Sequence, residues 1–245
     1  MNAIILCGGL STRLGDITKD IPKILLKIGD KTVLDWQLEK LKSVGVKEVV
    51  LAAGHLASVL VKEIGFVRYD MTIIYAIEDE KLDTGGAIKH GLEYVLHPDE
   101  PTIILNGDVL TTIDLSDMVS KLKSDSDGII LGSKVEDAAS YGTLDYSEDF
   151  HLNRFLEKQG EHKSGYINGG IYIFNPQIKK YFPDLKKFSI EYDVFPSVNH
   201  LYVYESDVAW VDVGVPERLG WARENWESFS IDSTDFHQRT DQSSD

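Results

Sequence analysis

The sequence predicts an α/β protein with a Rossmann-like, doubly wound, mixed sheet that is mostly parallel. Short apolar runs alternate with helical patterns over residues 1–133, and this β-α-β-α order implies right-handed crossovers between parallel strands. After residue 133 close-set strand patterns follow with little helix between them. We therefore expect a small, partly antiparallel region beside the parallel sheet or extending it.

The first strand is expected at residues 3–7, a nearly all-apolar run typical of a strand buried on both faces. A helix should follow over 32–45, because Thr32 and Asp35 have capping-box spacing and Gly45 can end it. The remaining elements of this half are predicted as strands at 49–53, 72–76, 102–105 and 129–131, and helices at 57–64, 84–96 and 115–122.

The second half predicts strands at 141–146, 150–158, 167–174, 201–206 and 209–213. A closing helix over 215–226 has Pro216 at its first position, where proline is favoured. No internal repeat or low-complexity linker interrupts the pattern, so residues 1–229 are predicted to form a single domain. Residues 230–245 are polar and poor in aliphatic side chains, which predicts a disordered tail.

The charge and the cysteine content limit the possible binding partners and cellular location. The chain carries 40 acidic and 25 basic residues, a net charge of −15, so nucleic acid and anionic membranes are not expected partners. One cysteine permits no internal disulfide, no apolar stretch reaches about 20 residues, and we expect no signal peptide. We expect a cytoplasmic protein.

The loop after the first strand, CGGLSTRLGDITKDIPK, points to a bound polyanion. Gly8 and Gly9 let backbone amides approach a ligand closely, and Arg13 and Lys23 bring positive charge to the carboxyl edge of the sheet, where ligands bind. An ordinary tight turn with solvated cations would look similar. The loop is neither a Walker A loop nor the G-x-G-x-x-G fingerprint.

Two aspartates also fall at predicted strand ends. Asp108 follows the strand at 102–105 in "LNGDV", and Asp212 lies in "WVDVG". Either one alone could be a turn or helix-cap residue. Together with the cationic loop they favour a shared Mg²⁺ site, since this ion prefers oxygen ligands and bridges phosphates.

Taken together, these motifs resemble the sugar-1-phosphate nucleotidylyltransferases over residues 1–227. The resemblance rests on "GGLSTRL", "PKI", "LDTGGAI", "NGD", "YGT", "FLEK", "INGGIY" and "VDVG" in this order. The details are most like the short guanylyltransferases for heptose 1-phosphate and mannose 1-phosphate. The chain departs from the family pattern at Ser11 and Asp83, where glycine is usual, and at Ile24 and Gln159, where proline is usual.

The resemblance implies transfer of a nucleotidyl group from an NTP, with GTP favoured, to manno-heptose or mannose 1-phosphate, with Mg²⁺ as cofactor. It implies a nucleotide-binding part at 1–133, a sugar-binding part at 134–229, catalytic Arg13 and Lys23, and metal-binding Asp108 and Asp212. The implied nucleotide-binding residues are Leu6, Gly8, Gly9, Ser11, Thr12, Thr84, Gly85, Gly86, Asn106 and Gly107. The implied sugar-phosphate-binding residues are Gly142, Glu157, Lys158, Asn168 and Gly169.

Several alternatives stay open on the sequence alone. Uridylyl or thymidylyl transfer to another sugar 1-phosphate, such as glucose or MurNAc 1-phosphate, would use a similar site. So would a phosphocholine cytidylyltransferase, a metal-dependent glycosyltransferase, or a nucleotide-sugar sensor without turnover. Assembly into a homo-oligomer also stays open.

Overall fold

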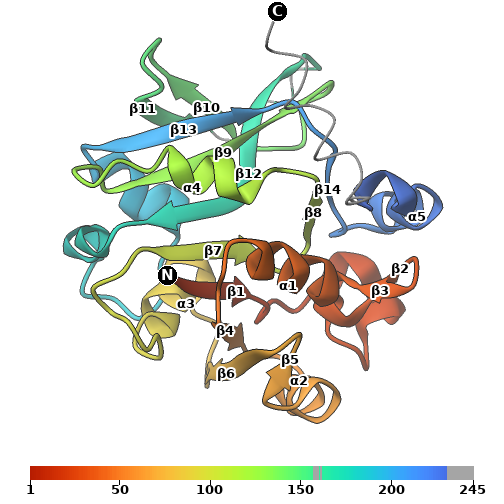
Figure 1. Cartoon of the computed structure of the whole chain (residues 1–245). Coiled ribbons are helices and arrows are strands. Elements are labelled where there is room, and N and C mark those ends of the chain that lie inside the picture. Colours follow the sequence, from red (N-terminus) through yellow and green to blue (C-terminus); the bar gives the residue numbers. More distant parts are fainter. Residues whose placement is uncertain (157–159, 161, 231–245) are drawn as a thin grey trace, which may run out of the picture.

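A mixed sheet forms the framework of the protein (Figure 1). The computed structural model describes residues 1–156, 160 and 162–230. Within this part of the chain, the sheet has ten strands, and its centre is the parallel block β7-β1-β4-β6. The bounds of these strands are Asn2–Leu6 for β1, Glu48–Ala53 for β4, Met71–Ile77 for β6 and Thr102–Asn106 for β7. The predicted parallel core is confirmed.

Successive side chains of each central strand enter different cores. Ala3 and Ile5 belong to one buried cluster, whereas Ile4 belongs to the other. The first cluster also takes residues from α1 (Val33–Ser43), α2 (Ala57–Ile64), α4 (Leu115–Ser120) and α5 (Pro216–Glu224). The second takes residues from α3 (Asp83–Gly91) and from the turns η3 (Pro176–Tyr181), η4 (Ile190–Val194) and η5 (Phe195–Ser197). A strand that must be apolar on both faces reads as a continuous apolar run.

The region after residue 133 extends the same sheet. β12 (Gly165–Phe174) runs antiparallel to both β7 and β9 (Gly128–Val135). β10 (Thr143–Tyr146) and β11 (Leu152–Leu156) continue the antiparallel pairing, while β13 (Leu201–Ser206) lies parallel to β9. The predicted antiparallel region is confirmed, and it also takes in the strand expected at 129–131.

Short elements escaped the sequence analysis because two- or three-residue strands and tight helical turns carry too little periodicity to be recognised. These are the strands β2 (Lys27–Ile28), β3 (Lys31–Thr32), β5 (Val67–Arg68) and β8 (Val109–Thr111), and the helical turns η1 (Thr12–Thr18), η2 (Lys23–Leu25) and η6 (Trp226–Phe229). The strand predicted at 209–213 is β14 (Trp210–Asp212).

Helix α3 is shorter than the predicted 84–96. After Gly91 the backbone changes to tighter turns, in which the amides of Glu93 and Tyr94 donate to the carbonyls of His90 and Gly91. The predicted tail, 230–245, lies outside the described residues apart from Ser230. No helix in the described ranges is long and apolar enough to span a membrane.

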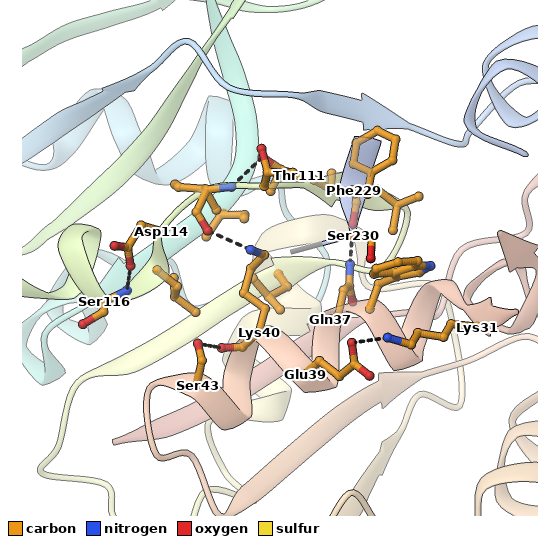
Figure 2. A pocket seen from close by; sticks show the side chains of 18 residues that line it. Lys31, Gln37, Glu39, Lys40, Ser43, Thr111, Asp114, Ser116, Phe229 and Ser230 are labelled. Atoms are coloured by element: carbon orange, nitrogen blue, oxygen red, sulfur yellow. Dashed lines mark hydrogen bonds and ion pairs between the residues drawn. The ribbon is translucent and has the colours of Figure 1, made fainter. Parts of the chain in front are cut away.

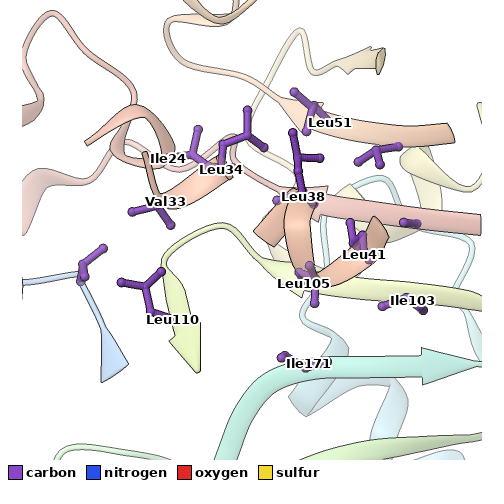
Figure 3. Close-up of a cluster of buried hydrophobic side chains, with 14 of the residues drawn as sticks. Ile24, Val33, Leu34, Leu38, Leu41, Leu51, Ile103, Leu105, Leu110 and Ile171 are labelled. Carbon is purple, nitrogen blue, oxygen red and sulfur yellow. The ribbon is translucent and has the colours of Figure 1, made fainter. Parts of the chain in front are cut away.

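Helix α1 is fixed at both its start and its buried face. Thr32 and Asp35 form the predicted capping box, in which each side chain bonds the other's backbone amide. Leu34, Leu38 and Leu41 are completely buried against the sheet (Figure 3). Burial of each such side chain contributes about 1.5–3 kcal/mol, so packing rather than propensity holds this helix in place.

Replacing Leu38 by alanine should lower the free energy of unfolding by about 2–5 kcal/mol, because it removes buried atoms and leaves a cavity. Equilibrium urea denaturation measures this change. Replacement of Leu185, which is 57% exposed, by alanine serves as the control and should change stability by less than about 0.5 kcal/mol. Equal losses in the two variants would contradict the packing described here.

Candidate active site

The loop after β1 exposes a run of unpaired backbone amides. In the part of the chain that the structure describes, the N–H groups of Gly8, Gly9, Leu10 and Ser11 donate to no protein acceptor. Ser11 has φ 50°, in the left-handed region, and its carbonyl accepts from Leu14 N at 2.9 Å and Thr18 Oγ1 at 3.2 Å. Adjacent free amides in such a turn form a site for anionic oxygen atoms.

The neighbouring strand β7 ends in a turn that presses against β1. Gly107 N donates to Leu6 O at 2.9 Å. A Cβ at residue 107 would lie 2.5 Å from the same Leu6 oxygen, a backbone atom with little freedom to move. Glycine therefore allows the turn to carry the next residue, Asp108, to the carboxyl end of β1.

A short two-stranded ribbon brings the second aspartate to the same place. β8 and β14 pair antiparallel with Val109 opposite Asp212, and Val213 N donates to Asp108 O at 2.9 Å. The ideal Cβ position of Gly214 lies 2.8 Å from Asp212 Oδ1, 3.3 Å from Arg13 Nη2 and 3.5 Å from Asp108 Oδ2. The structure thus brings the three predicted side chains to one point.

Each aspartate already has a cationic partner. Lys23 Nζ lies 2.5 Å from Asp108 Oδ2, and Arg218 Nη2 donates to Asp212 Oδ1 at 2.7 Å. Arg218 also lies over the ring of Tyr141, at 5.4 Å. Burial, with a smaller contribution from Asp212, raises the pKa of Tyr141 to about 12, so this side chain stays neutral. The pairs offset the repulsion between two nearby carboxylates.

The donor set suits a hard cation that is shared with a substrate. No cluster of three or more His, Cys, Asp or Glu side chains suited to a metal occurs among the described residues. Two carboxylates are nevertheless what Mg²⁺ commonly takes from a protein, with substrate phosphates and water completing its octahedron.

A cleft of about 630 Å³ opens beside these groups. Its walls combine the first loop, the 106–108 turn, the start of α3 and the segment 189–192. Predicted site residues in its lining are Leu6, Gly8, Gly9, Ser11, Lys23, Thr84, Asn106, Gly107, Asp108 and Gly142. Thr12, Arg13, Gly85, Gly86, Asn168, Gly169 and Asp212 do not line it.

Two predicted nucleotide-binding glycines have a packing role in this structure. The amides of Gly85 and Gly86 both donate to Phe188 O, at 2.9 and 3.1 Å. Thr84 Oγ1 donates to Glu191 Oε2 at 2.7 Å and accepts from Ile190 N at 3.0 Å. This segment of α3 therefore holds the 188–191 wall of the cleft.

The two departures from the family's glycines fall on left-handed backbone. Asp83 has φ 57°, as Ser11 has φ 50°, so both lie where glycine is favoured and where Asp and Ser are tolerated as single residues. Asp83 also has two cationic neighbours, Lys81 Nζ at 3.0 Å and Lys187 Nζ at 3.6 Å. Its negative charge beside the cleft is thereby largely offset.

The structure describes only some of the predicted sugar-phosphate-binding residues. Asn168 donates to Tyr172 Oη at 2.9 Å and accepts from Gly170 N at 3.0 Å, and Gly169 O accepts from Trp210 Nε1 at 2.9 Å. These contacts fix the conformation of β12 around residues 168–170. Glu157 and Lys158, together with the departure at Gln159, lie outside the described residues.

The sequence analysis missed Glu78 and Arg218. Glu78 lines the cleft, and its Oε1 lies 2.9 Å from the ideal Cβ position of Gly8. Burial raises the pKa of its carboxyl above the usual value. Asp108 was predicted as a site residue because it follows a predicted strand. Glu78 follows the strand predicted at 72–76 and could have been found by the same reasoning. Arg218, on the closing helix, has no such local signal.

Cys7, the single cysteine, is unreactive by its surroundings. Its thiol donates to Ala52 O at 3.3 Å, and burial, with a smaller effect of Glu78, raises its pKa to about 12. Since the thiolate is the nucleophile, a thiol of this kind takes no part in chemistry at neutral pH.

Residues 2–228 match the protein family described as nucleotidyl transferase. A D-glycero-α-D-manno-heptose 1-phosphate guanylyltransferase of Campylobacter jejuni is 40% identical over 220 residues, covering 89% of this chain and 96% of the relative. A mannose-1-phosphate guanyltransferase of Yarrowia lipolytica is 33% identical over 224 residues, and the match covers 89% of this chain but 61% of the relative. The chain thus spans about three fifths of the latter protein.

The crystal structure of HddC from Yersinia pseudotuberculosis complexed with GMP-PN has the same architecture. It superposes with a TM-score of 0.79 at 34% sequence identity, covering 92% of this chain and 99% of HddC. The fold class predicted from the sequence is therefore confirmed by a solved structure as well.

Replacing Gly107 by alanine should destabilise the protein by about 1–3 kcal/mol, because the new Cβ forces the turn away from Leu6 O. Thermal unfolding and urea titration measure the loss. Gly9→Ala is the matched control, since its Cβ would meet no atom within 4 Å. If the two variants were equally stable, the close approach of the turn to β1 would be wrong.

Proposed function

The chain belongs to the nucleotidyl transferase family, and we propose that it transfers a guanylyl group from GTP to a manno-configured sugar 1-phosphate. The products are a GDP-sugar and pyrophosphate. The single observation that carries the proposal is the convergence of Arg13, Asp108 and Asp212 beside a run of free amides. The guanylyltransferase relatives and the GMP-PN complex of HddC support guanine as the base and a manno-configured sugar.

The reaction needs alignment more than it needs acid or base. An oxygen of the sugar phosphate attacks the α-phosphorus of GTP, and the bond from that phosphorus to the bridging oxygen of the β-phosphate breaks. The nucleophile is already an anion at neutral pH, so no proton has to be removed. Repulsion between the anions is the barrier that the protein must lower.

Positive charge and amide dipoles are available where this charge develops. In the proposal, the free amides from Gly8 to Ser11, with Arg13, hold the β- and γ-phosphates and steady the departing pyrophosphate. Asp108 and Asp212 would hold Mg²⁺, which when bound neutralises phosphate charge. Lys23, which lies beside Asp108, would contact the α-phosphate in the proposal.

The two ion pairs have a further use in the proposed cycle. As long as Asp108 and Asp212 are paired with Lys23 and Arg218, these cations are occupied. If Asp108 and Asp212 held a divalent ion instead, the Lys23 ammonium and the Arg218 guanidinium would be free to bind substrate phosphates. Sugar-phosphate contacts from Lys158, Glu157, Gly142, Asn168 and Gly169 remain part of the proposal.

Glu78 gives the cleft a way to choose guanine. Its carboxylate lies against Gly8, on the wall that it shares with Lys81 and Thr84. The Watson–Crick edge of guanine offers two adjacent donors, N1–H and the N2 amino group, which a carboxylate can accept together. Adenine, uracil and thymine lack this pair of donors. The proposed assignment therefore favours GTP over ATP, UTP and dTTP.

Four parts of the proposal extend beyond the family relationship. Mg²⁺ is the expected cofactor on the chemistry of the two carboxylates. A cytoplasmic location and assembly into a homo-oligomer stay predictions. Heptose and mannose 1-phosphate are both retained as acceptors.

Arg13→Ala should lower kcat by about 10²- to 10³-fold, because it removes a charge aimed at the triphosphate. A pyrophosphate-release assay that crosses GTP, UTP, CTP, dTTP and ATP with a panel of sugar 1-phosphates measures turnover. Lys19→Ala, which removes an exposed cation from the same loop, is the control and should keep wild-type kcat. Wild-type turnover in Arg13→Ala would disprove the assignment of Arg13, and nucleotide-sugar binding without pyrophosphate release would indicate a sensor.

Glu78→Gln should raise the KM for GTP about ten- to hundredfold and weaken the preference for GTP over UTP, because one charged acceptor is lost. In the wild type, KM for GTP should rise as the pH falls through the raised pKa of Glu78, since the protonated carboxyl no longer accepts both donors. The variant should not show this rise. Glu80→Gln, whose side chain lies outside the cleft lining, is the control, and an unchanged KM in Glu78→Gln would refute guanine recognition by this residue.

A further inference from the structure

Gln37 is a buried polar residue that the site description has not yet used. It lies on α1, is 5% exposed, and points its amide nitrogen toward the turn after β7. Its Nε2 donates to Asn106 O at 2.8 Å and to Val109 O at 3.0 Å. These two carbonyls are on either side of Gly107 and Asp108, so one side chain ties down both ends of the metal-binding turn.

The other end of the same amide is left unsatisfied. Gln37 Oε1 is the one buried side-chain nitrogen or oxygen atom without a hydrogen-bond partner among residues 1–156, 160 and 162–230. Reversing the amide would place this oxygen against two carbonyl oxygens, so the two donated bonds fix its orientation. A buried acceptor without a partner costs free energy, which an apolar side chain of similar size would avoid. Packing alone therefore gives no reason for glutamine here.

A cavity lies beside the turn and α1. Gln37 lines a space of about 570 Å³ together with Val109, Leu110 and Thr111 of β8 (Figure 2). Val109, Leu110 and Thr111 are themselves buried, and Leu110 belongs to the same apolar cluster as Leu38 of α1. Apolar packing has little directional preference, whereas the two hydrogen bonds from Gln37 fix the position of the 106–109 backbone relative to α1.

The hydrogen bonds from Gln37 also help to position Asp212, the second predicted metal-binding aspartate. Val109, whose carbonyl Gln37 holds, is paired with Asp212 across the β8–β14 ribbon. Val213 N in turn donates to Asp108 O at 2.9 Å. A displacement of the 106–109 backbone would therefore move both carboxylates.

We propose that Gln37 is a positioning residue for the divalent-metal site, and that it acts by fixing the backbone on both sides of Asp108. The inference rests on the proposed function for the identity of the site. Gln37 touches neither substrate nor metal. Loss of a group that orients metal ligands typically costs about 10- to 100-fold in metal affinity or activity.

Gln37→Met tests the proposal, because methionine has similar length and volume but no donor. Lys40→Met is the matched control. Lys40 lies one turn along α1, lines the same cavity, and donates to a different carbonyl, Ile113 O at 2.7 Å (Figure 2). Gln37→Met thus loses two hydrogen bonds and Lys40→Met loses one, all from the same helix to the backbone, and only the bonds from Gln37 reach the metal-binding turn.

The first readout is the Mg²⁺ dependence of turnover in the full chain. In Gln37→Met the Mg²⁺ concentration for half-maximal kcat should rise about 10- to 100-fold, while KM for GTP at saturating Mg²⁺ stays within about twofold. Lys40→Met should keep the wild-type Mg²⁺ requirement. A wild-type Mg²⁺ requirement in Gln37→Met overturns the proposal.

The second readout needs no activity. Amide hydrogen exchange should show lost protection at Gly107 and Val213 in Gln37→Met, with β4 unchanged. Lys40→Met should leave both amides protected. Equal loss of protection throughout the sheet would show a general structural role and would overturn the proposal. Gln37→Asn, which keeps the amide but is too short to reach both carbonyls, replaces Gln37→Met if the latter does not fold.

Together these experiments distinguish a failure of the proposed function from a failure of the positioning role of Gln37. If the wild type releases no pyrophosphate with any pair of substrates, the proposed function fails, while exchange at Gly107 still decides whether Gln37 fixes the turn. If the wild type turns over and both readouts are unchanged in Gln37→Met, the positioning role fails alone.

Discussion

The close approach of Asp108 and Asp212 is the constraint on which the site depends. The two residues are far apart in the sequence, and their like charges repel each other. Pairing of β8 with β14 brings their backbones together, and Gly107 lets the first of them lie against β1. Ion pairs with Lys23 and Arg218 then offset the repulsion. Backbone pairing thus holds the two aspartates close together, and the cationic side chains reduce the electrostatic repulsion between them.

The same principle explains how an acidic chain can take up anionic ligands. The net charge of −15 would repel nucleotides at long range. Near the cleft, however, the charge is arranged differently. Arg13 faces the two aspartates, and Lys81 and Lys187 offset Asp83, one of the positions where the sequence was expected to depart from the family pattern. Local arrangement rather than overall charge therefore decides what the cleft can bind.

Much of this could be predicted from the sequence, because the relevant signals are local. The capping box at Thr32, proline at the start of α5 and the apolar run of β1 each depend on neighbouring residues, and all three were confirmed. Asp108 was predicted to follow a strand, and it lies in the turn after β7. Gln37 and Arg218 could not be found in this way, since an ordinary polar residue on a helix gives no sign of its distant partner. The amides of Gly85 and Gly86 show the reverse case, in which a family motif also serves to hold a neighbouring loop.

The two ion pairs at the aspartates have a consequence for the order in which ligands enter. A lone divalent ion meets carboxylates whose charge is already compensated, so it gains little by displacing a lysine and an arginine. A divalent ion that arrives as a complex with a triphosphate brings anionic oxygens that can take over both displaced cations. If the two aspartates hold the divalent ion as proposed, metal and nucleotide would enter best as one unit, and the ion pairs of the resting protein would disfavour binding of a divalent ion alone.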